Sequence, residues 1–106
     1  MEEQVEERTE ESAEKRAPKV GDVVLYRLSE NDAAAIATRR ASDHGRANIA
    51  GNEALAGDAF PMIIARVWDD DPGSAVNGQV ILDGQDTHWA TSVRAGAGPG
   101  SFSRRD

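Results

Sequence analysis

Three polar residues near a predicted hairpin turn, Asp83, Asp86 and His88, have side-chain types that could bind a metal ion. Carboxylates and an imidazole are common metal ligands, and a tight turn could bring them together. Polar residues at this spacing are also what a solvated turn requires. The second histidine, His44, has no serine nucleophile or carboxylate at a spacing typical of catalysis. We therefore predict no catalytic residue, no metal site and no cofactor, and a protein that is not an enzyme.

Two other patterns share only part of a ligand-binding motif. The run Asp69-Asp70-Asp71 offers three carboxylates, but a calcium loop spaces its oxygens around the ion and adds a distal glutamate that is absent here. The alternating glycines between 96 and 100 lack the strand and helix that flank a phosphate-binding loop. We interpret the first pattern as a solvated turn and the second as extended chain.

Aromatic side chains are the remaining candidates for binding. Tyr26, Trp68 and Trp89 could form a cage around a cation or a peptide. In a chain with only five aromatic residues, core packing or an interface with another protein explains them better. Phe102 stands in a Gly-rich C-terminal segment as a further anchor. These four residues are the predicted interaction anchors.

The elements that must position these residues are mostly strands. Short apolar runs between Phe60 and Val93 alternate as strands do, and the turn-forming clusters DDDPGS and DGQD separate them. With a first strand over 23–28, the expected strands cover 59–68, 79–82 and 87–93. We expect their large apolar side chains to form the core: Val24, Tyr26, Ile64, Val67, Trp68, Val80, Leu82 and Trp89.

A short helix is expected between the first and second strands. Ser29 is followed three positions later by Asp32, a capping-box spacing, and helix-forming residues continue over 33–40. The predicted fold class is therefore mainly β, a small SH3-like antiparallel barrel or meander with one short helix inserted after the first strand and a flexible acidic N-terminal segment. His88 is expected on the more exposed face of its strand.

The segment 41–57 is long and irregular for a connection within a compact domain. We expect Ile49 and Leu55 to pin it to the barrel. A simple surface loop and a binding loop that covers a pocket both remain open, because closure entropy grows only slowly with loop length.

Composition divides the 106 residues into one domain and two flanking segments. Residues 1–17 are predicted as an acidic tail, disordered or ordered as a helix by a partner, because seven of the first 16 residues are glutamates and very few are apolar. The barrel domain is predicted over 18–95, and a Gly-rich tail over 96–106. No signal peptide and no transmembrane segment are expected, because no apolar run is long enough.

Charge and cysteine content restrict the partners. The formal net charge is −7, and no basic cluster emerges when the acidic tail is set aside, so we expect no direct nucleic-acid binding. The chain has no cysteine, which excludes disulfides and thiolate metal sites. That composition suits a reducing cytoplasm or an extracellular particle that needs no bridges.

Four blocks in order carry a resemblance to a known group of proteins. They read VGDVVLYRLSENDA, GNEALAGDAFP, RVW and VNGQVILDGQDTHWATS, at residues 20–33, 51–61, 66–68 and 76–92. Together they resemble small proteins encoded by tailed bacteriophages and prophages of actinobacteria, over about Lys19 to Gly100. Members of that group usually end in an aromatic-rich Trp-His-Trp motif, which Ser101 to Arg105 replace here. The strand pattern is also similar to Tudor-like and other SH3-like small barrels.

The resemblance implies a viral origin and no catalytic residues. The first hypothesis is a non-enzymatic phage accessory protein, a virion component such as a capsid decoration or head–tail accessory protein, bound to phage structural proteins through an exposed strand edge. An intracellular phage protein that inhibits a host factor is the alternative, since an acidic surface can mimic nucleic acid. A small ligand-binding barrel is the third. A homo-oligomer is compatible with each.

Overall fold

The computed structural model describes residues 16–42, 52–84 and 86–104. Almost all of the predicted acidic tail, together with His44 and Ile49, lies outside these residues. No helix within the described ranges is long and apolar enough to cross a membrane.

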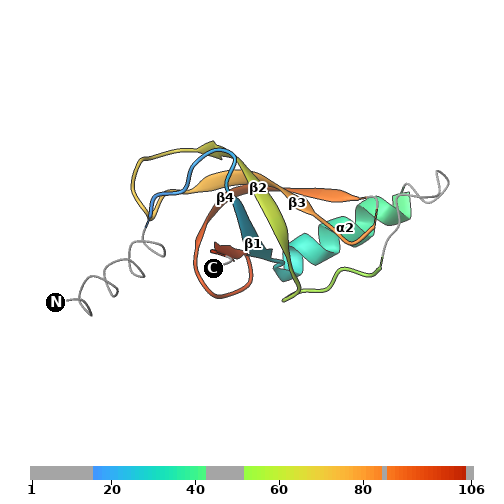
Figure 1. The fold of residues 1–106 in the computed structure, drawn as a ribbon. Coiled ribbons are helices and arrows are strands. Elements are labelled where there is room, and N and C mark those ends of the chain that lie inside the picture. Colours follow the sequence, from blue (N-terminus) through green and yellow to red (C-terminus); the bar gives the residue numbers. More distant parts are fainter. Residues whose placement is uncertain (1–15, 43–51, 85, 105–106) are drawn as a thin grey trace.

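Five strands and one helix make up the described chain (Figure 1). In order they are β1 (Val23–Arg27), α2 (Glu30–Ser42), β2 (Ala59–Val67), β3 (Val76–Ile81), β4 (Thr87–Ala95) and β5 (Ser101–Ser103). Each strand bonds to the next and β5 returns to β1, so the sheet closes into a barrel. The predicted mainly β fold, with a short helix after the first strand, is confirmed.

Closure of the barrel depends on β5, which the sequence analysis placed in a C-terminal tail. β5 runs antiparallel to β1, with Tyr26 opposite Phe102, and parallel to β4, with Ala95 opposite Phe102. Gly100 turns the chain into this strand at a φ of 80°, where a side chain would be strained, and its amide donates to the carbonyl of Arg27. The five strands therefore form a closed barrel, in which β5 pairs with two residues of β1 and two of β4. Attachment through a strand edge stays a prediction.

The core lies inside the barrel and extends to one residue of α2. Strand side chains alternate between buried and exposed along β1 and β3, as a sheet with one packed face requires. The buried apolar residues include most of those predicted, plus several that were not. The large side chains missed are Leu28, Ile36, Met62, Val76, Val93 and Phe102.

Two tryptophans expected in the core lie on the surface instead. Trp68 is 50% exposed and Trp89 is 46% exposed. In β4 the inward residues are His88 and Ala90, so Trp89 between them points outward. His88 is buried rather than exposed for the same reason. A register shift between Ile64 and Arg66 changes the phase of β2 before Trp68.

Gly78 occupies a position in β3 where a side chain cannot fit. A Cβ there would lie 2.6 Å from Cγ of Met62 and 2.8 Å from the carbonyl oxygen of Ile63. Replacing Gly78 with alanine is expected to lower the free energy of unfolding by about 1–3 kcal/mol, because backbone or core must move. Urea denaturation measures the change. Gly98→Ala is the control, since nothing lies within 4 Å of that site; equal midpoints for the two variants would contradict the close contact.

Candidate interaction surface

Asp32 lies at the first turn of α2 and joins the helix to the barrel. The amide of Ser29 donates to Oδ2 of Asp32 over 2.9 Å, and the amide of Asp32 donates to Oγ of Ser29 over 3.0 Å. This reciprocal pair is the predicted capping box, with aspartate in place of glutamate. The hydroxyl of Tyr26 in β1 also donates to Oδ2, and Nε2 of His88 in β4 lies 2.9 Å from Oδ1. One carboxylate thus connects the helix to two strands.

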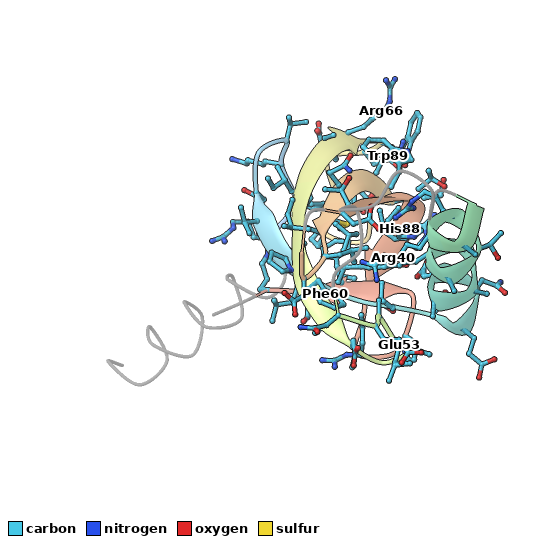
Figure 2. All side chains as sticks on the ribbon, turned by 90° about the vertical axis from the view of Figure 1, so that its right-hand side faces the viewer. Arg40, Glu53, Phe60, Arg66, His88 and Trp89 are labelled. Carbon is cyan, nitrogen blue, oxygen red and sulfur yellow. The ribbon has the colours of Figure 1, made fainter. Side chains whose placement is uncertain are left out.

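Asp86 makes a second connection at the other end of the helix. Its Oδ2 accepts hydrogen bonds from Arg39 at 2.5 Å and from Arg40 at 2.9 Å, and its side chain is 7% exposed. Arg39 also donates to the carbonyl oxygen of Thr87, and Arg40 to that of Asn52. Figure 2 shows Arg40 and His88 between the helix and the strands. Hydrogen bonds to ionised carboxylates therefore fix the first turn of α2 to β1 and β4, and its last turn to the β3–β4 turn.

The three residues first considered as metal ligands are engaged with different partners. Asp86 binds the two helix arginines, His88 binds Asp32, and Asp83 accepts a hydrogen bond from Asn52. Within the part of the chain that the structure describes, no group of three acidic or histidine side chains could hold a metal ion.

The electrostatics of the two connections follow from these bonds. Burial raises the pKa of Asp32, but hydrogen bonds from Ser29, Tyr26 and His88 outweigh it and hold the pKa below its ordinary value. Burial also raises the pKa of Asp86, but the hydrogen bonds and positive charges of Arg39 and Arg40 outweigh burial and hold this pKa below its ordinary value. Burial and the neighbouring carboxylate of Asp32 raise the pKa of Tyr26. At neutral pH the site is therefore two carboxylates and a neutral phenol, all hydrogen-bonded.

Stability is expected to depend on these carboxylates in acid. A carboxyl with a lowered folded pKa stabilises the fold while it is ionised, so its contribution is complete above the unfolded value of 3.8 and is lost as the pH falls through the folded pKa. Urea midpoints should therefore decline below about pH 4. Asp86→Asn should be less stable at pH 7 and decline less steeply in acid. An identical acid slope for wild type and variant would contradict this assignment.

The strands carry an exposed apolar surface on the outside of the barrel, away from the core. We define the outer face as the outward-pointing residues of β1 to β4 that continue across the sheet: Val23, Leu25, Pro61, Ile63, Gln79, Ile81 and Trp89. Strand pairing places four of them in one row, Val23 opposite Ile63, Ile63 opposite Gln79, and Gln79 opposite Trp89. The three apolar members of this row are 39%, 43% and 46% exposed.

One basic residue extends this surface beyond the row. The guanidinium carbon of Arg66 lies 4.5 Å from the centroid of the Trp68 ring, a cation–π contact between exposed side chains. Figure 2 shows Arg66 and Trp89 projecting from the same side of the barrel, with Glu53 on the opposite side. The sequence analysis did not single out Arg66, because it placed Trp68 in the core.

The structure separates the four predicted anchors into two pairs. Tyr26 is 2% exposed and Phe102 is 3% exposed, and both pack in the core. Trp68 and Trp89 are on the surface, so Tyr26 does not converge with them into an aromatic cage. Only the two tryptophans are accessible to a partner.

The segment after α2 is anchored differently from the expectation. Leu55, which was expected to pin it, is 52% exposed, whereas the neighbouring Ala54 is buried. Backbone hydrogen bonds hold this part to the end of β1: the amide of Gly57 donates to the carbonyl of Leu28, and the amide of Leu28 to that of Asp58. Backbone hydrogen bonds and the small side chain of Ala54 therefore hold this part in place of Leu55, and Ile49 lies outside the described residues.

Comparison with known proteins adds no relative to this description. The chain matches no protein-family model, no curated protein and no solved structure.

Proposed function

We propose that this chain is a non-enzymatic accessory protein of a tailed bacteriophage that attaches to a larger assembly through its outer face. The assembly proposed is the virion, with the chain as a capsid decoration or head–tail accessory protein. The sequence resemblance supports the phage origin. The observation that supports attachment is the exposed row from Val23 to Trp89.

An exposed apolar row of this kind needs a physical reason. Single apolar side chains are common on protein surfaces, but a contiguous patch that includes a half-exposed tryptophan is typical of interaction sites. Tryptophan and arginine are also the residues most often found at the energetic centre of protein interfaces. Because the five strands close into a barrel, we expect attachment by side-chain packing on the outer face rather than by strand addition.

The proposal is tested with phage particles. Mass spectrometry of purified virions should find this chain at many copies per particle, and purified protein should bind particles assembled without it. Trp89→Ala should bind at least about tenfold more weakly, as expected for an interface anchor. Absence from virions, with a tight complex to a soluble host protein, would replace this proposal with inhibition of a host factor.

A further inference from the structure

We propose that the outer face recognises a protein segment with apolar side chains and a carboxylate, and that this carboxylate binds Arg66 while the apolar side chains pack on Ile63 and Trp89. This inference rests on the proposed attachment function and specifies the chemistry of the partner.

Arg66 has a charge that the described chain does not neutralise. Arg39 and Arg40 both bind Asp86, and Arg104 binds Asp22 at 3.1 Å. Among the residues in the described ranges Arg66 forms no ion pair, and its guanidinium carbon lies over the ring of Trp68. Arginine can lie over an aromatic ring and still form two parallel bonds to a carboxylate through its N–H groups.

The charge distribution around Arg66 favours an acidic group. The chain has 19 acidic residues and a net charge of −7, yet none of the residues in the five strands is aspartate or glutamate. The carboxylates nearest in sequence, Asp69 to Asp71, belong to the turn after Trp68, where Oδ1 of Asp71 accepts the amide of Gly73. These carboxylates would repel an acidic partner at the turn, so a partner carboxylate is best placed on the strand side of Arg66.

A second copy of this chain fits the outer face less well. In a two-fold contact the same surface lies on both sides, so Arg66 would meet a face that also has no carboxylate. Nucleic acid is a poor match because phosphate binding needs several clustered cations, whereas the strands carry three arginines in a chain of net charge −7. A heterologous protein segment with a carboxylate satisfies both the apolar row and the arginine.

The experiment uses the full-length chain carrying Arg66→Lys, together with a carbodiimide. The reagent activates a carboxylate, the introduced amine attacks the activated carbonyl, and an amide forms as the urea leaves, so only groups in direct contact are joined. The probes are phage particles assembled without this chain and, separately, the soluble extract of infected cells. Mass spectrometry of the adduct then identifies the partner residue.

The inference expects an adduct between position 66 and an aspartate or glutamate flanked by apolar residues. Binding should fall at least about tenfold for Arg66→Gln and for Trp89→Ala, and should be unchanged for Glu53→Gln on the opposite side. Both outer-face variants alter exposed side chains, and urea denaturation checks that they remain folded.

The outcomes separate the two proposals. No binding of wild type to particles, with an adduct at position 66 to a soluble protein, would reject the virion role and keep the partner chemistry. Binding to particles that Arg66→Gln leaves unchanged would keep attachment and reject the role of Arg66. An adduct to a second copy of this chain, binding to nucleic acid through this face, or no adduct in either probe would overturn the inference.

Discussion

Replacing Phe102 with alanine is expected to lower the free energy of unfolding by about 3–5 kcal/mol, close to the whole stability of a domain of this size. Phe102 is 3% exposed and is the only large apolar side chain of β5. Its removal would leave a cavity in the core. It would also weaken the strand that closes the barrel between β1 and β4. Urea or thermal denaturation of the purified variant measures the loss.

Trp89→Ala is the matched control, and it is expected to cost less than about 1 kcal/mol although it removes a larger side chain. Trp89 is 46% exposed and lies outside the core, so its truncation leaves no buried cavity. A Trp89 variant that unfolds while the Phe102 variant keeps its melting temperature would reverse the assignment of inner and outer faces. It would also remove the basis for the proposed interaction surface.

The strand pattern predicted the class of fold but not which side chains face inward. Strict alternation along β4 predicts that Trp89, Thr91 and Val93 share one face. The structure buries Ala90 and Val93, which are three residues apart, because the pairing shifts between Val76 and Gly78 and Ser92 adopts a φ of 55°. A bulge changes the alternation without changing the residues, so neither face could be assigned from periodicity alone.

β5 was missed for a related reason. A three-residue strand between polar residues and glycines has no alternation to detect, and only Phe102 marked the segment as anchored. Its pairing with β1 joins parts of the chain about 76 residues apart, as the partners Tyr26 and Phe102 show. Such contacts depend on closure of the whole barrel and leave little trace in local sequence.

The polar connections were predictable only where they are local. The capping box joins residues three positions apart and was read directly from Ser29 and Asp32. The bond from His88 to Asp32 spans 56 positions, and the bond from Arg39 to Asp86 spans 47. Arg39 and Arg40 lie in the last helical turn, where cations suit the helix dipole, but the buried carboxylate that binds them could be found only from the packing of α2 on the barrel.

Replacing Asp32 with alanine is expected to lower the free energy of unfolding by about 2–4 kcal/mol, more than the loss of a helix cap alone. The cap to Ser29 would be lost, and the Tyr26 hydroxyl would remain in the core without its acceptor. His88, which is also buried, would lose its partner on α2. Glu30→Ala changes an exposed acidic residue in the same helical turn and should cost no more than about 0.5 kcal/mol.

A double-mutant cycle distinguishes this network from a general need for charge at the helix N-terminus. Tyr26→Phe removes only the hydroxyl, so in the wild-type background it should cost about 1–2 kcal/mol through the lost bond to a charged acceptor. In the Asp32→Ala background the same change should be neutral or stabilising, because it removes a buried donor that no longer has a partner. Equal costs in the two backgrounds would mean that Tyr26 and Asp32 act independently, and that the helix is held to β1 by packing alone.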